Sequence, residues 1–253
     1  MTSTVLVTGG TGTLGRHVVP QLVDSGFKVR LLSRNNHQSG DGIEYVTGDL
    51  LTGVGIEAAV DNAEIVLHLA GAPKGDDVAT RNLATAAART GVRHLVYISV
   101  IGADRVPLAW VRSKLDAERA IAESGVPWTT LRAAQFHELT TTVVAKLAKL
   151  PVVLAPGGLR LQPVDSRDVA ARLVELTLGE PAGLVPDLAG PKIYPLAELV
   201  QTYLSGLGKR RRPALPIRIP GKAGRAYRAG ENLSFDGAVG ARTWEDFQAE
   251  RPR

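Results

Sequence analysis

Three glycines near the start of the chain have the spacing of a phosphate-binding turn. Gly9, Gly12 and Gly15 follow the apolar run Val5–Val7 and precede a stretch whose apolar residues recur at helical intervals. The first glycine would make a tight turn, the second would let phosphate oxygens approach the backbone, and the third would let the helix pack closely on the strand. The amino end of that helix would face the phosphates. The pattern predicts a dinucleotide-binding loop rather than a purely structural turn, with Pro20 expected to kink the helix.

The end of the second predicted strand indicates which dinucleotide is bound. Ser33 and Arg34 stand about 20 residues after the glycines, where an NAD site places an acidic residue for the ribose hydroxyls. A 2′-phosphate is instead bound by arginine through charge-assisted hydrogen bonds. The sequence therefore favours NADP over NAD, with an ordinary surface arginine as the alternative.

A lysine and a tryptophan four residues apart, Lys114 and Trp110, form a second group of chemical interest. On a helix this spacing places both side chains on one face. The lysine could hold ribose hydroxyls or supply a proton, whereas an indole N–H donates a hydrogen bond but releases no proton near neutral pH. We therefore expect Trp110 either to stack on a planar substrate or simply to fill the wall of a cleft.

Two further side chains are candidates for proton transfer. His137 is expected either to donate a proton to substrate or to be a hydrogen-bonded structural histidine. Ser99 is another proton source, and it shares a strand face with Tyr97, which we expect to be buried. Asp165 and Asp168 have the spacing of a helix cap and a first-turn charge, and not that of a catalytic carboxylate pair.

The elements that must position these residues alternate between strand and helix. The strand candidates are continuous apolar runs, as expected of parallel strands covered on both faces: Val5–Val7, Val29–Leu32, Ile43–Val46, Ile65–Leu69, Leu95–Val100 and Trp128–Leu131. Helical periodicity is found at Leu14–Asp24, Ile56–Val60, Val78–Thr90, Lys114–Ser124, Leu139–Lys149, Val169–Leu178 and Ala197–Tyr203. Gly26, Gly91 and Gly125 follow three of the helices, where a left-handed cap is favoured.

This alternation predicts an α/β fold with a doubly wound parallel sheet of the Rossmann type. We expect residues 1–134 to form the dinucleotide-binding core. Residues 135–253, which include the Pro/Gly-rich segment Pro151–Gly158, should form mainly a smaller C-terminal substrate lobe, with some segments returning to the core.

The sequence resembles the atypical (extended) short-chain dehydrogenase/reductase superfamily, and within it the NmrA-like branch. The superfamily resemblance rests on Thr8–Gly15, Gly48–Leu50, His68–Gly71 and Leu95–Val100. The branch is indicated by a combination of shorter matches: Gly91-Val92, Ser99, Lys114 with Glu118, Thr130–Arg132, Phe136–Glu138, Gln162–Val164, Asp168–Ala170 and Thr243–Phe247. The resemblance covers nearly the whole chain. It implies a fold that either reduces small carbonyl, quinone or ene substrates or senses the redox state of its cofactor.

The resemblance also implies roles for individual residues. The cofactor would be held by the turn, including Thr11, Thr13 and Leu14 beside its glycines, and by Ser33 and Arg34. Asp49 and Leu50 would lie by the adenine. The nicotinamide ribose would contact Leu69, Ala70, Gly71, Ala72, Ser99 and Lys114. The nicotinamide itself would lie near Ala133, Ala134, Gln135 and Phe136. Phe136, His137 and Trp110 would contact substrate.

One departure from the superfamily affects the predicted chemistry. Its reductases pair a tyrosine with a lysine four residues later, but here Lys114 is preceded by Trp110. The proton for a reduced carbonyl would then come from water, from Ser99 or Lys114, or from a phenolic or polyketide-like substrate. The alternative is a protein that binds NADP(H) as a sensor and catalyses nothing. A sugar-nucleotide epimerase is disfavoured, since that chemistry uses the missing tyrosine as its base.

Composition excludes several other classes. The chain has 253 residues, of which 44% are hydrophobic, and no cysteine, so neither a disulfide nor a thiolate metal site is expected. No histidine cluster has metal-ligand spacing and no GxxxxGK[ST] loop is present. Apolar runs are strand-length, and the start lacks the pattern of a signal peptide. We expect a cytoplasmic monomer or homodimer that acts on a small molecule, with no metal and no membrane partner.

The positive charge of the chain is concentrated near its end. The formal net charge is +5, and Lys209–Arg212 is the densest basic run. Such a run can contact nucleic acid or another anionic surface. Because no aromatic residues are interleaved with it, a solvated loop is the preferred interpretation and a nucleic-acid partner is not expected.

Overall fold

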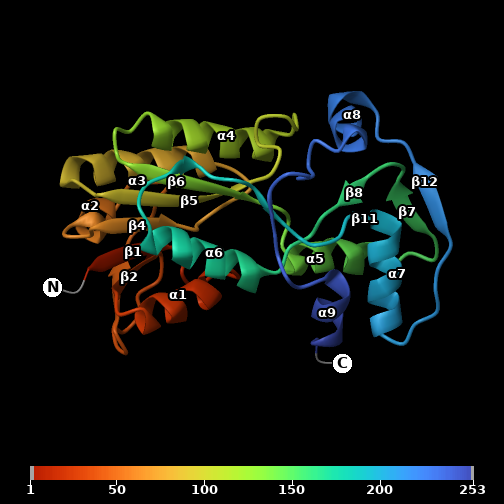
Figure 1. Ribbon diagram of the computed structural model, residues 1–253, viewed down its shortest axis with the longest axis horizontal. Coiled ribbons are helices and arrows are strands. Elements are labelled where there is room, and N and C mark those ends of the chain that lie inside the picture. Colours follow the sequence, from red (N-terminus) through yellow and green to blue (C-terminus); the bar gives the residue numbers. More distant parts are fainter. Residues whose placement is uncertain (1–2, 252–253) are drawn as a thin grey trace. The chain divides into compact units, whose positions relative to one another are not determined.

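The computed structural model describes residues 3–251 and divides them into two compact units, each built from several chain segments. The first unit contains the chain up to Ser99, then Arg112–Leu131 and Ala170–Val185; the second contains Val100–Val111, Arg132–Val169 and the chain from Pro186 on. The division after residue 134 that the sequence suggests remains a prediction. Figure 1 identifies the elements of both units.

The first unit is organised around a parallel sheet. Its strand order is β6-β5-β4-β1-β2-β3, and β9 also pairs with β6. Strand β1 lies in the middle and pairs in parallel with both β2 and β4. The last residues of β5 and β6 belong to the second unit. The strands are β1 (Thr4–Thr8), β2 (Lys28–Ser33), β3 (Ile43–Thr47), β4 (Ile65–His68), β5 (His94–Val100), β6 (Trp128–Ala133) and β9 (Gly183–Leu184).

Helices cover both faces of this sheet, which explains why its central strands read as continuous apolar runs. Figure 1 shows α3 and α4 on one face and α1 and α6 on the other. All four residues of β4 are buried. One face packs in a cluster that includes Leu6, Val66, Leu95 and Ile121. The helices are α1 (Gly15–Asp24), α2 (Ile56–Val60), α3 (Asp76–Thr90), α4 (Ala109–Ala122) and α6 (Ser166–Leu178). The predicted Rossmann-type α/β fold is confirmed.

Several predicted helix boundaries need correction. Helix α3 begins at Asp76 instead of Val78, because acidic residues in a first turn are stabilised by the helix dipole although they carry no apolar periodicity. Helix α4 begins at Ala109 instead of Lys114, so Trp110 and Lys114 do lie on one helix. Helix α1 continues past Pro20, and the predicted kink remains a prediction. Gly91 has a φ of 72° and caps α3 as expected.

The second unit combines helices with short strand pairs. Strands β7 (Val153–Pro156) and β12 (Ala214–Ile217) are parallel, and β8 (Arg160–Leu161) and β11 (Tyr194–Pro195) are antiparallel. Strand β10 (Leu188–Ala189) pairs with Ala133 and with β13 (Ala238–Val239). The helices are α5 (His137–Leu147), α7 (Leu196–Gly206), α8 (Gly221–Ala229) and α9 (Trp244–Ala249).

The core of the second unit forms around an aromatic residue close to the end of the chain. Trp244 is fully buried with Val144, Val153, Tyr194 and Leu199. Helices α8 and α9 were not predicted from the sequence, and no strand was predicted in the Pro/Gly-rich segment 151–158, which contains β7. These elements are short and derive their stability from tertiary packing, which leaves little periodic signal in the sequence.

Candidate functional site

The glycine turn has the geometry that its spacing predicts. Gly9 has a φ of 70°, and a Cβ there would lie 2.7 Å from the backbone nitrogen of Ala70. A Cβ on Gly15 would collide with the backbone of Gly10. Gly12 differs from both, because it is exposed and a Cβ there would meet only the carbonyl oxygen of Gly9, at 3.2 Å. The fold therefore requires the first and third glycines, whereas the space at Gly12 is left open to solvent.

The amino end of α1 provides hydrogen-bond donors beside this space. No side chain caps the helix at Leu14. Within residues 3–251, the backbone amides of Thr13 and Leu14 donate to no other group, while the amide of Gly12 closes the turn on the carbonyl of Gly9 at 3.0 Å. Free amides at a helix amino end form a favourable site for phosphate. The open space at Gly12 and these free amides fit the pyrophosphate of a dinucleotide.

The other cofactor residues predicted in the first unit lie at the same edge of the sheet. Because β1 to β4 are parallel strands of one sheet, the segments that follow them emerge at the same edge. Arg34 is exposed just after β2, and the hydroxyl of Ser33 accepts a hydrogen bond from the amide of Asn35. Asp49 accepts from the amide of Leu51 at 2.7 Å. The remaining members are half-buried Leu50, Leu69 and Ala70, and exposed Thr11, Gly71 and Ala72.

A buried chain of hydrogen bonds fixes the segment after β4. The amide of Ala70 donates to Thr8 Oγ1, which lies 2.6 Å from His68 Nδ1. His68 Nε2 lies 2.9 Å from Thr80 Oγ1, and that hydroxyl donates to the backbone carbonyl of Asp76. This order of donors is complete only if His68 carries its single proton on Nε2. Burial, reinforced by the charge of Lys114, lowers the pKa of His68 to about 3 and keeps the ring neutral.

A buried ion pair lies beside this chain. Lys114 Nζ is 2.7 Å from Asp76 Oδ2, with side-chain exposures of 13% and 3%. The ammonium also donates to the hydroxyl of Tyr97 at 3.2 Å, and the other oxygen of Asp76 accepts from the amide of Ala72 at 3.1 Å. A Cβ on Gly71 would be 3.2 Å from Lys114 Nζ. Asp76 thus ties the lysine to the segment 69–72, where the resemblance would place the nicotinamide ribose.

The two hydroxyl groups on β5 are both engaged. Tyr97 is fully buried, as expected, and burial together with the Asp76 and Glu118 carboxylates raises its pKa well above its usual value of 10. Ser99 is also buried and donates to Glu118 at 2.5 Å. Both side chains face helices that cover the sheet, α3 and α4. Neither proton is readily released near neutral pH.

The remaining predicted residues belong to the second unit. Trp110 is 39% exposed, whereas Ala133 and Ala134 are buried. Gln135 and Phe136 are half-buried, and Phe136 is the N-cap residue immediately before α5. His137 is fully buried: its Nε2 lies 3.2 Å from the carbonyl oxygen of Pro163, and its ring contacts Trp244 and Phe247.

Asp165 and Asp168, also in the second unit, have structural partners. Asp165 accepts from the backbone amide and the guanidinium of Arg167, and its Oδ2 lies 3.6 Å from His137 Nδ1. These contacts outweigh burial and hold the pKa of Asp165 well below its usual range. Asp168 binds the backbone amides of Ala241 and Arg242. As expected, Asp165 caps the start of α6 and Asp168 is an acidic residue in its first turn. Asp168 also holds the segment before α9 through these two hydrogen bonds.

The residues around Lys114 were not predicted from the sequence. Asp76 and Thr80 had no assigned role, and Thr8 and His68 entered only as parts of motifs. The available signal was positional, since Thr8 and His68 end two neighbouring strands and Tyr97 lies two residues before Ser99. Nothing in the sequence indicates that Asp76, in the first turn of α3, contacts a lysine 38 residues later.

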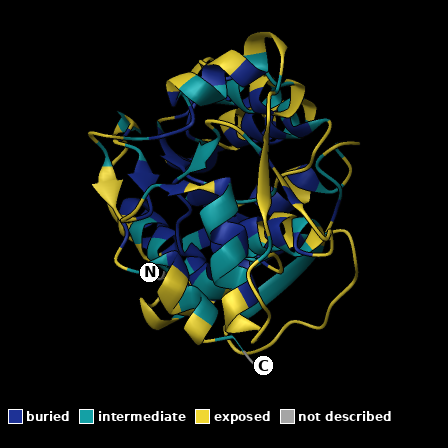
Figure 2. Cartoon of the chain, turned by 90° about the vertical axis from the view of Figure 1, so that its right-hand side faces the viewer, coloured by how far each residue is buried: buried dark blue, intermediate teal, exposed yellow. Residues whose placement is uncertain are grey.

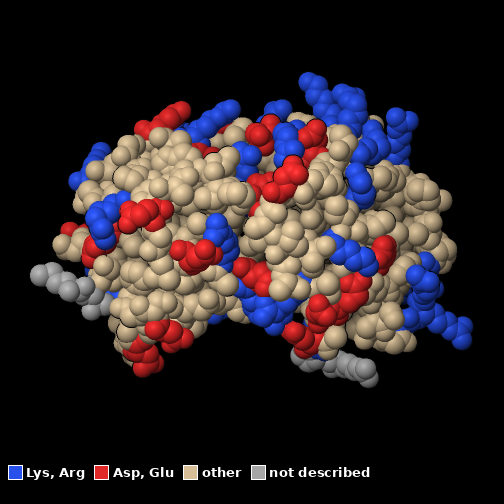
Figure 3. Space-filling view, viewed as in Figure 1, with Lys and Arg blue, Asp and Glu red and all other residues tan. Residues whose placement is uncertain are grey.

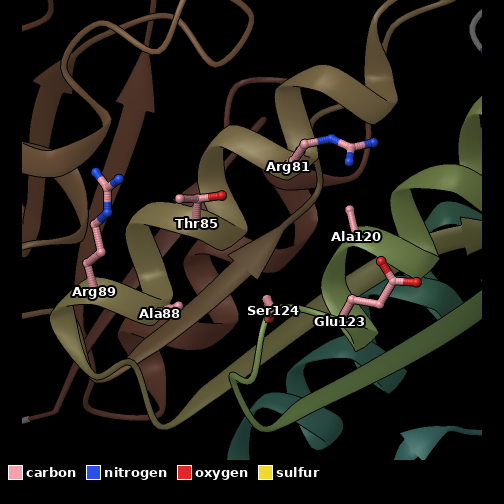
Figure 4. A pocket seen from close by; sticks show the side chains of 7 residues that line it. All are labelled: Arg81, Thr85, Ala88, Arg89, Ala120, Glu123 and Ser124. Atoms are coloured by element: carbon pink, nitrogen blue, oxygen red, sulfur yellow. The ribbon is translucent and has the colours of Figure 1, made fainter.

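Elsewhere, the described residues form a surface hollow, but they contain neither a metal-ion cluster nor a membrane-spanning helix. The hollow, of about 460 Å³, lies between α3 and the end of α4. Figure 4 shows the side chains that line it, which are Arg81, Thr85, Ala88, Arg89, Ala120, Glu123 and Ser124. None of these residues is a predicted cofactor or substrate residue. The described part of the chain contains no cluster of three or more His, Asp or Glu side chains that would suit a metal ion. None of the helices between residues 3 and 251 has both the length and the hydropathy of a membrane span.

Comparisons with known proteins agree with the fold and the loop. The sequence profile of a family described as NAD(P)H-binding matches residues 9–178. The (4-alkanoyl-5-oxo-2,5-dihydrofuran-3-yl)methyl phosphate reductase of Streptomyces griseus is 34% identical over 181 residues, which are 69% of this chain and 63% of that protein. Photosystem II assembly factor Ycf39 of Trieres chinensis is 27% identical over 214 residues, 78% of this chain and 66% of that protein. The chain therefore spans slightly under two thirds of the length of these relatives.

A solved structure supports the same fold. The NADPH-dependent quinone oxidoreductase of Escherichia coli, determined with NADPH, superposes with a TM-score of 0.84 over 97% of this chain and 98% of that chain, at 19% identity. The fold and the glycine loop define a Rossmann-type dinucleotide-binding protein. More specifically, the chain belongs to the NAD(P)H-binding family, and its cofactor is a nicotinamide dinucleotide.

Proposed function

We propose that this protein is an NADPH-dependent oxidoreductase of the NmrA-like type that reduces a carbonyl or quinone-like group, polyketide or aromatic substrates included. The observation that carries the proposal is the ammonium of Lys114, which is held by Asp76 beside Gly71 at the edge of the sheet where the cofactor loop lies. The names of the Streptomyces reductase and the E. coli quinone oxidoreductase support reduction of a small conjugated or carbonyl compound.

The residues near Lys114 suggest how the chain would assist such a reduction. Bound NADPH would supply the hydride. Lys114 would donate hydrogen bonds to the ribose hydroxyls and place a positive charge where the substrate oxygen becomes negative. Because Tyr97 and Ser99 hold their protons, we assign proton delivery to Lys114 or to water. Trp110 and Phe136 are proposed to contact substrate. The complete burial of His137 favours its structural alternative over proton donation.

A cofactor sensor is the second candidate, and a specific observation favours it. Trp110 stands on α4 where the reductases of the resembled superfamily carry their tyrosine acid, and Tyr97 cannot replace that acid because its hydroxyl is buried. One relative is named as an assembly factor instead of a reductase. A sensor would bind NADPH tightly and leave it unconsumed.

Turnover distinguishes the two candidates. We would measure NADPH consumption with a panel of quinones, enones and polycyclic aromatic ketones, in parallel with calorimetric titration of NADPH. Consumption that depends on one of these compounds supports the reductase. Tight binding without consumption across the panel would establish the sensor.

Replacing Arg34 by alanine should weaken NADP(H) binding and leave NAD(H) binding nearly unchanged. We propose that the exposed guanidinium after β2 binds the 2′-phosphate. A charge-assisted hydrogen bond contributes about 1.5–3 kcal/mol, so we expect roughly a 10- to 100-fold loss. Calorimetry with both cofactors measures it, with Arg81→Ala as the control at an exposed arginine away from the loop. Equal affinities for the two cofactors in the unaltered protein would refute the preference.

Replacing Trp110 by phenylalanine should retain most of the activity, because a stacking face remains and no titrating group is lost. Trp110→Ala should weaken substrate binding by about 1–3 kcal/mol and thus raise KM more than it lowers kcat. Steady-state kinetics with the substrate found in the panel measures both effects. If Trp110→Phe lowered kcat as much as Lys114→Ala, the indole N–H would have a specific role and our interpretation of Trp110 would be wrong.

A further inference from the structure

The second unit exposes an apolar face on its two-stranded parallel sheet. In β7, Val153 and Ala155 are buried while Leu154 between them is 39% exposed, so Leu154 lies on the outer face. The register pairs Leu154 with Leu215 of β12, and Ile217 follows Leu215 on the same face. All four residues of β12 are exposed. Figure 2 views this side of the molecule, with exposed residues in yellow. An aliphatic surface on an exposed sheet therefore faces solvent.

The chain around this face is strongly basic. Residues 139–164, which contain β7, include three Lys or Arg residues and no Asp or Glu. Residues 199–230, which contain β12, include eight Lys or Arg residues and again no acidic residue. In Figure 3 the basic side chains gather where Figure 1 draws α8 and the segment between α7 and β12. Since the whole chain carries only +5, its remainder is net negative.

These cations are not neutralised by the unit itself. Within the described chain, none of the Lys or Arg residues of the two segments forms an ion pair with a carboxylate. Two arginines have structural contacts, because Arg212 binds Gln201 and the carbonyl of Leu150 and Arg228 binds the carbonyl of Ile219. Arg211 lines a surface hollow that also contains Glu198 and Glu245, but it forms no ion pair with either of them. Lys209, Arg210 and Arg211 are exposed in the segment between α7 and β12.

We propose that this surface, the outer face of β7 and β12 with the basic residues of 139–164 and 199–230, docks on an anionic lipid bilayer. Aliphatic side chains gain free energy at the boundary between headgroups and acyl chains, and neighbouring cations are attracted to anionic lipids. A second copy is a poor occupant, because two such faces would repel each other. Nucleic acid suits the charge but not the aliphatic side chains, which offer bases nothing to stack on.

Docking on the surface of a bilayer requires no membrane-spanning segment. The sequence-based expectation of no membrane partner rested only on the lack of an apolar run long enough to span a membrane. The proposal is also independent of the reductase assignment. The surface lies wholly in the second unit, and the experiment measures binding to lipid vesicles and not NADPH consumption. A protein that reduced nothing could still bind vesicles, and one that bound no vesicle could still reduce a quinone. The two tests therefore fail separately.

The test is co-sedimentation of the full chain with vesicles of phosphatidylcholine alone and of an equimolar mixture with phosphatidylglycerol. We expect binding to the mixed vesicles only, decreasing as salt is raised. The variant Lys209→Glu/Arg210→Glu/Arg211→Glu should reduce partition at least about 100-fold, since each cation near an anionic leaflet contributes roughly a factor of five. The matched charge control, Arg81→Glu/Arg89→Glu/Arg93→Glu in the first unit, should retain most of the binding.

The apolar contribution is tested separately. Leu215→Ser should weaken partition on mixed vesicles, whereas Leu184→Ser should not, although the two leucines have nearly equal exposures of 53% and 51%. Unchanged NADPH affinity shows that each variant is folded. No binding to the mixed vesicles, or equal losses in the variants and their controls, would overturn the proposal. Preferential binding of a single-stranded oligonucleotide that is insensitive to Leu215→Ser would assign the surface to nucleic acid instead.

Discussion

Replacing Gly12 by valine is expected to abolish NADPH binding while the protein remains folded. Within the protein, a Cβ at this position would meet only the carbonyl oxygen of Gly9, at 3.2 Å. A small local shift would therefore accommodate a side chain. The backbone at Gly12 does not require glycine either, since its φ is not positive. The branches of valine would instead fill the open space beside the free amides of Thr13 and Leu14, where the phosphates would bind. We expect an affinity loss of at least about 100-fold, or roughly 2.7 kcal/mol.

Calorimetric titration with NADPH measures this loss, and circular dichroism with thermal unfolding shows whether the fold is kept. Gly40→Val is a matched control, because Gly40 is also exposed, has no positive φ and has open space around its Cβ position. Gly9 and Gly15 are unsuitable for the experiment, since a side chain at either would collide with backbone and disturb the fold. Retained binding by Gly12→Val would mean that this turn does not hold the dinucleotide.

The geometry of the glycine turn could be predicted from the sequence because the positive φ at Gly9 and the contact of Gly15 with Gly10 are local requirements. A tight turn at Gly9 and close packing at Gly15 exclude a Cβ, so sequence alone marks these positions. The fold itself leaves the position at Gly12 open, and we propose that a bound dinucleotide is what requires a small residue there. Parallel neighbours then bring Arg34 and the segment 69–72 to the same edge of the sheet, a consequence of strand order that the alternation of elements already implies.

The environment of Lys114 could not be predicted in the same way. Its partners Asp76 and Tyr97 come from α3 and β5, and the contacts depend on how two helices pack over one sheet face. Periodicity showed that Tyr97 and Ser99 share a face, but not that a buried carboxylate would meet both Tyr97 and the lysine. Similarly, the burial of His137 follows from Trp244, which reaches it from a helix near the end of the chain that has no strong sequence signal.

Replacing Asp76 by alanine should destabilise the protein by about 3–5 kcal/mol, because it removes one partner of a buried ion pair. Lys114, whose side chain is only 13% exposed, would lose its carboxylate partner, and the amide of Ala72 would lose its acceptor. Denaturant unfolding measures the change in the free energy of unfolding. Asp116→Ala is the control, since Asp116 pairs with Arg119 at the surface of α4 and its loss should change stability by less than about 1 kcal/mol.

A double-mutant cycle separates the ion pair from the other contacts of Asp76. Lys114→Met removes the charge and keeps an apolar side chain of similar length, so Asp76→Ala/Lys114→Met should be clearly more stable than the sum of the two single changes predicts, with a coupling of at least about 1 kcal/mol. Additive effects would show that Asp76 acts mainly through the amide of Ala72. NADPH affinity provides the functional readout: it should fall in every variant without Lys114. In Asp76→Asn, whose amide oxygen can still accept from Ala72, the affinity should fall less than in Asp76→Ala, because the segment that we propose to contact the ribose stays in place.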